Sequence, residues 1–482
     1  MELILEQIPW IVMPIIFPLI GSMACFLFPA KAKSLGLLTS LVVLACVTRL
    51  GWQLKALGSL RYPMGGWGAP LGIDLYADGL SLLMLLMAAL VGLGISIYSS
   101  SYFSRDKARH FWPLWLFLCG ALNALFLSAD IFNLYVTLEL LGLTAVALVA
   151  LAGGADALIA AMRYLLVSLL GSLFYLLGVA LIYHSVGSLD IAILAQRVEP
   201  SPAMWAAVGL ISTGLLLKTA LFPMHFWLPP AHASAPAPVS ALMSALVVKA
   251  SFYILLRMWL EFFQTQDGAF ANLLGLLGAL AVLWGGIQAL RQTRLKLLIA
   301  YSTVSQLGYL FLAFPLGTSL AWKGALYMLF SHAMAKAAMF MAAGNIQFFA
   351  GHDRIAELGS ITQRLPLTLT AFALAGISLM GLPPSGGFIG KWLLLQASIE
   401  SGQWWWGIIL LLGGFLAAGY VFKVIAHVFT HDEPTSRTVT LPATMEWSAL
   451  GLALIAVLLG LFTYWPLAML EMGSPFGTGH SG

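Results

Sequence analysis

Charged residues and cysteines are both scarce in this chain. Aspartate, glutamate, lysine and arginine make up only 9% of its 482 residues, too few to cover a water-exposed surface. The three cysteines, Cys25, Cys46 and Cys119, stand singly in apolar stretches without a Cys-x-x-Cys spacing. This pattern indicates buried free thiols rather than a disulfide framework, a zinc site or an iron–sulfur cluster.

Signatures of redox catalysis and of nucleic-acid binding are missing as well. The sequence has no Gly-x-Gly-x-x-Gly fingerprint set in a soluble fold and no obvious pair of haem ligands, which disfavours an oxidoreductase in its own right. The net charge of +4 is spread over loops without a long basic run, so nucleic acid is not an expected partner. No cofactor and no metal ion are expected.

Apolar sequence, in contrast, is abundant. Hydrophobic residues make up 61% of the chain and its mean hydropathy is +0.94, as is typical of a polytopic membrane protein. At about 20 residues per crossing, the length accommodates about fourteen helices in a single all-α membrane domain. The spans expected in this domain, residues 1–482, are 8–28, 34–51, 78–100, 112–128, 130–152, 162–184, 204–228, 238–262, 272–290, 299–315, 322–345, 366–399, 404–428 and 446–468.

Basic residues are distributed unevenly between the loops. Most of them follow odd-numbered spans, namely Lys31, Lys33, Arg105, Lys107, Arg109, Arg291, Arg294, Lys296, Arg354 and Arg364. The positive-inside rule therefore predicts that these loops are cytoplasmic and that both termini lie on the outer side of a cell membrane. Glu2 and Glu6 precede the first span and lysines follow it, the reverse of a cleaved signal peptide, so we expect this span to be retained.

Prolines interrupt two of the expected spans. Span seven continues into LKTALFPMHFWLPPAHASAPAPVSAL, with Pro223 and Pro229, and span twelve contains GLPPSGGFIGKW, with Pro383 and Pro384. Proline removes a backbone donor and clashes with the preceding turn, so each helix is expected to be broken into two halves. The alternative is that these prolines mark loops between shorter helices.

The two breaks are five spans apart, and this spacing predicts an internal repeat. A repeat with an odd number of crossings must be inverted in its second copy, as in many secondary transporters. The two inverted five-helix repeats are expected at residues 106–265 and 266–430. Three helices in residues 1–105 precede them, and a last helix with a short tail follows in residues 431–482.

Lysines inside apolar stretches are the strongest functional signal. Lys218 precedes the first break, Lys391 follows the second, and Lys249 lies within span eight. A charged side chain at the bilayer centre costs roughly 2.5–3.5 kcal/mol, so these lysines are expected to face a polar interior. Glu139, surrounded by leucines in span five, needs a cationic partner or a proton. Together these residues indicate a buried proton path; the alternative is a set of polar groups satisfied by local contacts.

Four segments resemble a known family of membrane subunits. In order and spacing, over roughly residues 70–430, they resemble the antiporter-like subunits shared by Mrp-type cation/proton antiporters, respiratory complex I and membrane-bound hydrogenases. The length and the lysine in span twelve are most similar to the Mrp D subunit. The segments are IFNLYVTLELLGLTAVALVAL, LKTALFPMHFWLPPAHASAPAPVSALMSALVVKASFYILLR, SHAMAKAAMFMAAGNI and GLPPSGGFIGKWLLLQ.

The resemblance implies a relay of protonatable groups along the membrane midplane. Glu139 matches the family's glutamate that pairs with the lysine before the first break, here Lys218. Lys249 matches the central lysine of the relay, and Lys391 matches its terminal lysine. Opening and closing of the Glu139–Lys218 pair would then move one proton along the relay.

Three further side chains are candidates for the same relay. His332 and Lys336 match the segment between the central and terminal lysines, and their four-residue spacing places them on one helix face. His225 lies beside the first break, where an imidazole could pass protons or cap freed carbonyl groups. The alternatives are a packing histidine and a lysine that reaches the membrane surface. His232 is more simply explained as a cap.

One departure from the family pattern lies at the first break. Many relatives read Trp-Leu-Pro-Asp there, whereas this chain has Pro230 in place of the aspartate, so any role of that carboxylate is in doubt. The resemblance implies a proton-translocating subunit of a multisubunit sodium/proton antiporter, with other membrane subunits as partners. The alternatives are a subunit of a complex I-type NADH:quinone oxidoreductase, of a membrane-bound hydrogenase or of an inorganic carbon transporter, and a structural scaffold.

Overall fold

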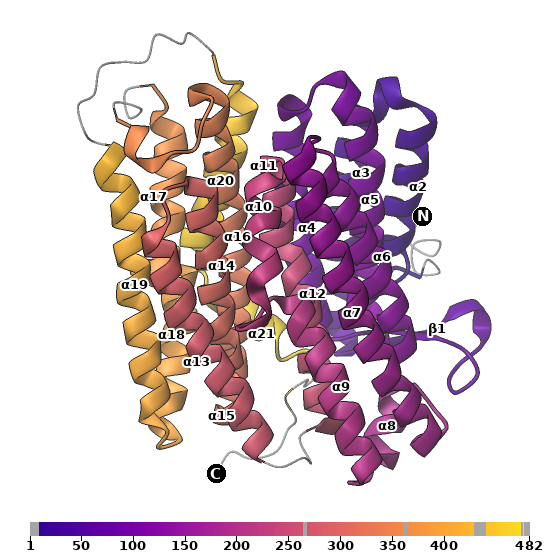
Figure 1. Cartoon of the computed structure of the whole chain (residues 1–482). Coiled ribbons are helices and arrows are strands. Elements are labelled where there is room, and N and C mark those ends of the chain that lie inside the picture. The colour runs from indigo at the N-terminus through magenta and orange to yellow at the C-terminus, as the bar shows by residue number, and fades with distance from the viewer. Residues whose placement is uncertain (1–8, 264–267, 360–363, 429–439, 474–475, 477–482) are drawn as a thin grey trace.

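The computed structural model describes residues 9–263, 268–359, 364–428, 440–473 and 476. Glu2, Glu6 and most of the expected tail lie outside the described residues. Helices running side by side along one common direction dominate the structure (Figure 1). Of the described residues before α9, seven segments form α-helices: six long ones, α2 (Met13–Leu27), α3 (Ala32–Leu57), α4 (Gly79–Tyr102), α5 (Arg105–Leu127), α6 (Ile131–Ala150) and α7 (Ala155–Val186), and the short α8 (Ile191–Arg197).

The remaining elements include two interrupted helices, α9 with α10 and α17 with α18. After α8 the chain forms α9 (Pro202–Thr219), the 3-10 turn η3 (Met224–Trp227), α10 (Leu228–Ser234), α11 (Ala237–Leu242), the π-helical turn η4 (Met243–Val247), α12 (Val248–Met258) and the π-helical turn η5 (Trp259–Phe263). It is followed by α13 (Gly268–Arg291), α14 (Leu295–Phe311), α15 (Ala313–Leu316), α16 (Ser319–Ala350), α17 (Pro366–Met380), α18 (Gly386–Glu400), α19 (Trp404–Val428), α20 (Ala443–Leu458) and α21 (Tyr464–Met469).

The predicted helical membrane architecture is confirmed. Eleven helical stretches of the described chain are long and apolar enough to cross a membrane, and three shorter apolar helices, α2, α17 and α20, accompany them. The number of fourteen crossings and the inverted repeats stay predictions. A short antiparallel hairpin, β1 (Leu60–Pro63) and β2 (Asp74–Ala77), was not expected from the sequence, because strands of four residues in a loop leave little periodic signal.

Both predicted helix breaks are present, although the prolines have different roles in them. α9 ends at Thr219, and Ala220 adopts a left-handed conformation with φ of 58°. Pro229 lies in the first turn of α10, where its missing N–H would have no helical partner anyway, so it starts the second half-helix. Pro383 and Pro384 lie in the non-helical link between α17 and α18.

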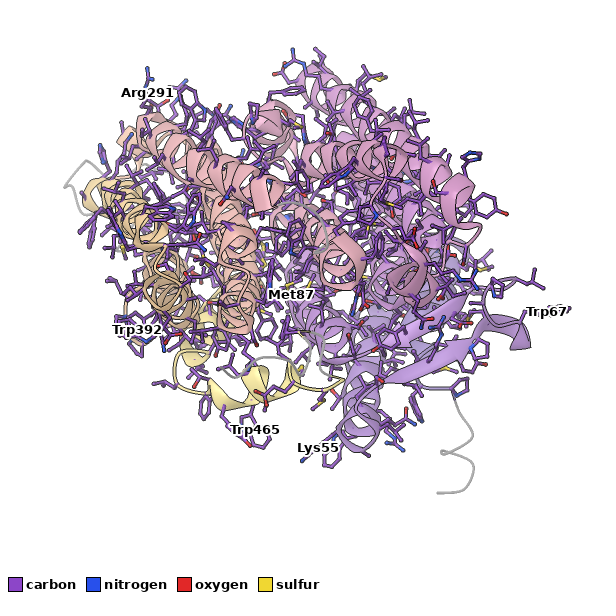
Figure 2. The ribbon with its side chains drawn as sticks, turned by 90° about the horizontal axis from the view of Figure 1, so that it is seen from below. Lys55, Trp67, Met87, Arg291, Trp392 and Trp465 are labelled. Atoms are coloured by element: carbon purple, nitrogen blue, oxygen red, sulfur yellow. The ribbon has the colours of Figure 1, made fainter. Side chains whose placement is uncertain are left out.

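Burial identifies the centre and the periphery of the subunit. The apolar stretches of α16 and of the segment from α11 to η5 are 100% buried, whereas those of α7 and α19 are 44% and 33% buried. Figure 1 shows α16 in the interior and α19 at one edge, and Figure 2 places Trp67 and Trp392 at opposite sides of the subunit. Three residues of the expected relay, Lys249, His332 and Lys336, therefore lie in segments that the chain itself surrounds.

Candidate functional site

A buried ion pair joins α6 to α9. Nζ of Lys218, in the last turn of α9, lies 2.8 Å from Oε1 of Glu139 and 3.1 Å from Oγ of Ser168 on α7. The Ser172 hydroxyl donates a short hydrogen bond to the same carboxylate oxygen. The lysine and glutamate side chains are 7% and 17% exposed, so the pair lies close to the lateral surface without being open to it. The structure thus brings together the two residues that the sequence paired.

A small cavity extends from this pair toward the helix that carries Lys249. Its volume of about 10 Å³ is close to the ~10–15 Å³ that one water molecule requires. Ser168 and Lys218 line one side and Ser251 of α12 lines the other, and Thr219 donates a 2.8 Å hydrogen bond to Ser251. Hydroxyl groups therefore line the space between the first and second lysines of the expected relay.

Lys249 lies fully buried directly after the π-helical turn η4. Its Nζ donates a 2.7 Å hydrogen bond to the carbonyl oxygen of Ser244, which the π-helical turn leaves available. The Ser244 hydroxyl in turn bonds Thr303 on α14 at 2.8 Å. Neither this turn nor its hydroxyl partners had been predicted, because a π-helical turn carries no distinctive sequence pattern.

Lys336 is equally buried, near the centre of α16. Its Nζ donates to the carbonyl oxygen of Ile299, at 3.0 Å, and to the hydroxyl of Ser302 in a short contact. Ser302 and Thr303 are consecutive residues of α14, so the partner of Lys336 and the partner of Ser244, whose carbonyl binds Lys249, are neighbours in the chain. The acceptors around both lysines are neutral.

Lys391 is positioned by the second helix break. Its Nζ donates to the carbonyl oxygens of Leu379, at 2.8 Å, and Met380, at 3.1 Å, at the end of α17, where helical partners are missing. Gly381 follows with φ of +81°, and a Cβ there would lie 2.7 Å from Cδ of Lys391. The break therefore supplies both the acceptors and the space for this lysine.

A glutamine and a tyrosine link the sites of Lys336 and Lys391. Gln306 of α14 donates to the Leu379 carbonyl, at 3.3 Å, and to the Tyr420 hydroxyl of α19, at 3.4 Å. Tyr420 also lies near Ser302, the partner of Lys336. A continuous series of polar groups therefore extends from Lys336 to Lys391. The sequence analysis missed both residues, since a lone glutamine or tyrosine in an apolar helix has no distinctive signal.

The two histidines of the expected relay make less direct contacts with its lysines. His332 is buried within electrostatic range of Lys249, Lys336 and Lys391, and its Nε2 has no hydrogen-bond partner among the described residues. His225 stacks on Phe222 with ring centres 5.7 Å apart, and no hydrogen bond of the described residues joins it to the lysines. His332 is thus close to the lysines of the relay, whereas no contact of the described residues places His225 among them.

A separate polar cavity is lined by residues outside the expected relay. It has a volume of about 420 Å³ and lies beside the end of α10, with Lys107 and Lys296 in its lining. Lys296 is buried and donates to the carbonyl oxygens of Ala233 and Ala235, so its amine caps α10. The described parts of the chain contain no group of three or more histidine, cysteine, aspartate or glutamate residues that could hold a metal ion.

The family of the chain follows from the sequence between α5 and α19. Residues 128–417 match the family described as NADH:quinone oxidoreductase/Mrp antiporter, TM. The chain belongs to this family. Residues 67–111 match a second family, described as NADH-Ubiquinone oxidoreductase (complex I), chain 5 N-terminus. The resemblance inferred from the four sequence segments is confirmed.

Two relatives of this chain are named as subunits of different membrane complexes. The N subunit of the NADH-quinone oxidoreductase of Desulforudis audaxviator (strain MP104C) is 37% identical over 425 residues, which cover 83% of this chain and 84% of that protein. The D subunit of the Na(+)/H(+) antiporter of Bacillus subtilis (strain 168) is 29% identical over 480 residues, which cover 95% of this chain and 94% of that protein.

Solved structures of multisubunit membrane complexes contain the same fold. A chain of the membrane-bound sulfane sulfur reductase, an archaeal respiratory membrane complex, matches with a TM-score of 0.90 at 28% identity, covering 97% of each chain. A chain of respiratory complex I from Thermus thermophilus matches with a TM-score of 0.78 at 27% identity, covering 96% of this chain and 100% of that one. A chain of the Mrp complex from Dietzia sp. DQ12-45-1b matches in fold, with a TM-score of 0.87 at 23% identity, covering 97% and 98%.

Proposed function

We propose that this chain is the proton-translocating subunit of a multisubunit, Mrp-type sodium/proton antiporter. The observation that carries the proposal is a set of four lysines inside the helical region, three of them buried and Lys391 half-buried. Lys218 binds a carboxylate, and Lys249, Lys336 and Lys391 bind carbonyl and hydroxyl oxygens. The end-to-end similarity to the D subunit of the sodium/proton antiporter of Bacillus subtilis supports the antiporter branch of the family.

The proposed relay starts at the Glu139–Lys218 pair. The pair stabilises the ammonium group of Lys218 while it is closed, and opening the pair removes this stabilisation and favours transfer of the proton. Ser251 and the small cavity beside Lys218 provide polar groups on the way to Lys249. From there Thr303, Ser302 and the following polar groups lead to Lys336 and Lys391.

The cation of the proposed antiporter is a separate question from the proton relay. The relay residues of the described chain provide a single carboxylate, Glu139, whereas a sodium site requires several oxygen ligands around one point. We therefore propose that this subunit carries protons and that partner subunits handle the cation. The basic loops are proposed to face the cytoplasm and both termini the outer side.

A second candidate is a proton-pumping subunit of a complex I-type oxidoreductase. It is favoured by the 37% identity to the N subunit of the NADH-quinone oxidoreductase of Desulforudis audaxviator. The same lysine relay would serve in that case, but electron transfer in other subunits would drive it. The two candidates therefore differ in the driving reaction and not in the site.

Transport measurements in inverted vesicles that carry the whole complex test both candidates. Dissipation of a pH gradient is compared between the parent, Lys218→Ala, Lys391→Ala and the surface control Lys323→Ala, with assembly verified for each. Loss of sodium-driven proton movement in the first two variants supports the antiporter proposal. Unchanged transport in both refutes the relay, and proton movement driven only by an electron donor refutes antiport in favour of the second candidate.

A further inference from the structure

A second row of polar residues leaves the relay at Lys249 and follows one face of α12. Tyr253, Arg257 and Glu261 come after Lys249 at intervals of four residues, and side chains with this spacing share a helix face. Twelve residues of helix rise about 18 Å, slightly more than half of a hydrocarbon core of about 30 Å. The row therefore has the length needed to connect the membrane midplane with one surface.

Burial changes along the row as a path to the surface requires. Lys249 is fully buried and Tyr253 is 1% exposed. The Arg257 side chain is 4% exposed, whereas that of Glu261 is 34% exposed. The turn η5, which carries Glu261, packs against α8, and Asp190 at the start of α8 binds Arg61 of the β1–β2 hairpin. Glu261 therefore lies on the hairpin side, which the positive-inside rule assigns to the outer face.

A buried arginine–aspartate pair lies between Tyr253 and Glu261 in this row. Both terminal nitrogens of Arg257 bind the Asp78 carboxylate, at 2.5 Å and 2.8 Å. The same guanidinium donates to Ser81, at 3.0 Å, and to the Tyr253 hydroxyl, at 3.2 Å, and its Nη1 lies 4.0 Å from Glu261. Tyr76 of β2 faces it with its ring 5.7 Å away. These contacts join every group between Tyr253 and Glu261.

We propose that this face of α12 is a route by which protons pass between Lys249 and the outer surface, with the Asp78–Arg257 pair as its gate. The proposal rests on the proton-carrying function argued above and adds a second direction to it. The guanidinium of Arg257 stays protonated, so the carriers are the Glu261 and Asp78 carboxylates, the Ser81 and Tyr253 hydroxyls and the Lys249 amine.

Each step of this route conserves protons and charge. A carboxylate takes up a proton and releases it to the next group, and a hydroxyl oxygen accepts one proton while it donates its own onward. In the structure the Tyr253 hydroxyl donates instead to the Phe126 carbonyl at 2.7 Å, and Arg257 occupies both oxygens of Asp78. The route is therefore closed in this conformation, and release of Asp78 by Arg257 opens it.

The test uses one conservative variant at each end of the route, each with a matched control. Tyr253→Phe removes a buried hydroxyl and keeps the ring; Tyr98→Phe does the same to a buried tyrosine that donates to the Met341 carbonyl at 3.1 Å. Glu261→Gln removes a surface carboxylate; Glu471→Gln removes another, paired with Lys323 at 2.9 Å. Glu261→Asp restores the carboxylate.

Proteoliposomes containing the whole complex allow the pH on each side to be set separately. We expect Tyr253→Phe and Glu261→Gln to lower the maximal proton rate at least about a hundredfold, at the low end of the range for a lost proton-transfer group. The sodium concentration for half-maximal rate should be unchanged, Glu261→Asp should recover most of the rate, and the loss in Glu261→Gln should depend on the outer pH.

Parent rates in either Tyr253→Phe or Glu261→Gln, with assembly intact, would overturn the route, because every proton on it must pass both groups. An equal loss in the two controls would also overturn it. If Tyr253→Phe fails to assemble, the two Glu261 substitutions and the Glu471→Gln control at the surface still decide the question. The comparison applies to sodium-driven or electron-donor-driven proton movement alike, so failure of the antiporter proposal remains distinguishable from failure of the route.

Discussion

The Nζ atom of Lys391 lies 4.7 Å from the centre of the Tyr309 ring, directly over its face. The other polar contacts of this amine are two carbonyl oxygens at the end of α17. An aromatic face attracts a cation by about 0.5–2 kcal/mol, more where water is excluded. Tyr309 therefore contributes to the stabilisation of Lys391 in its charged form without a carboxylate.

Replacement of Tyr309 separates the contribution of its ring from that of its hydroxyl. Tyr309→Leu removes the aromatic face, and a loss of about 1.4 kcal/mol corresponds to a tenfold lower population of the charged form. Proton transport by the assembled complex should fall several-fold. Tyr309→Phe keeps the ring and should transport like the parent, because the described residues offer the hydroxyl no hydrogen-bond partner. Equal losses in both variants would contradict the ring interaction.

Two adjacent glycines of α19 allow the same contact to be disturbed from the opposite side. A Cβ at Gly413 would lie 2.1 Å from the Tyr309 hydroxyl oxygen and 2.4 Å from Val282, so the tyrosine ring must move in Gly413→Ala. We expect transport to fall as in Tyr309→Leu, together with about 1–3 kcal/mol of lost stability from overpacking. Gly414→Ala, whose Cβ meets Met380 at an ordinary 3.6 Å, is the control in transport and thermal-unfolding measurements.

Ser302 provides a test of the centre of the relay. Ser302→Ala removes an acceptor of Lys336, and a hydrogen bond to a charged group contributes about 1.5–3 kcal/mol. The proton rate should fall by about tenfold or more. Ser305→Ala, which removes an equally buried hydroxyl donating to the Val282 carbonyl at 2.9 Å, should leave the rate near that of the parent. A Ser302→Ala variant with full activity would exclude this serine from the relay.

Removing both charges of the Glu139–Lys218 pair should restore stability but not transport. Glu139→Gln leaves a buried ammonium group without its carboxylate, and breaking a buried pair costs about 3–5 kcal/mol, less here because the glutamate is 17% exposed. The double variant Glu139→Gln/Lys218→Met removes both charges and should recover much of the lost stability. Its proton transport should remain abolished, because the protonatable lysine is gone.

Thermal unfolding of the purified complex and transport in vesicles measure the two effects separately. Leu173→Ala on the exposed face of α7 is the control for a nearby substitution outside the pair, since this leucine is 63% exposed. Recovery of transport in the double variant would contradict the pair's role in proton movement. Equal stability of the single and double variants would contradict the ionic nature of the contact.

Some features of the site and of the fold could be predicted from individual residues. The pairing of Glu139 with Lys218 came from the family resemblance, and chemistry agrees with it, because a carboxylate and an ammonium group in apolar helices each require a partner. Pro223 and Pro383 marked the broken helices correctly, since proline cannot continue the backbone hydrogen-bond pattern. Pro229, in contrast, begins a half-helix, and only its position relative to Ala220 and η3 distinguishes these roles.

Other parts of the site could not be predicted from the sequence. Ser302, Gln306 and Tyr420 come from two helices more than a hundred residues apart in the chain, and each is unremarkable in its own segment. The π-helical turn before Lys249 and the row from Tyr253 to Glu261 depend on the exact winding of one helix. The β1–β2 hairpin was missed because two strands of four residues leave little periodic signal in the sequence.

The sequence by itself determined that this protein lies in lipid and that its buried charges require polar partners. Apolar stretches of membrane length, with a few ionisable residues inside them, require helices that enclose those residues, because lipid cannot solvate a charge or an unpaired backbone group. The tertiary structure alone decided which acceptor each lysine holds. That choice depends on where breaks and π-helical turns free carbonyl groups, and on which hydroxyls neighbouring helices bring within hydrogen-bonding distance.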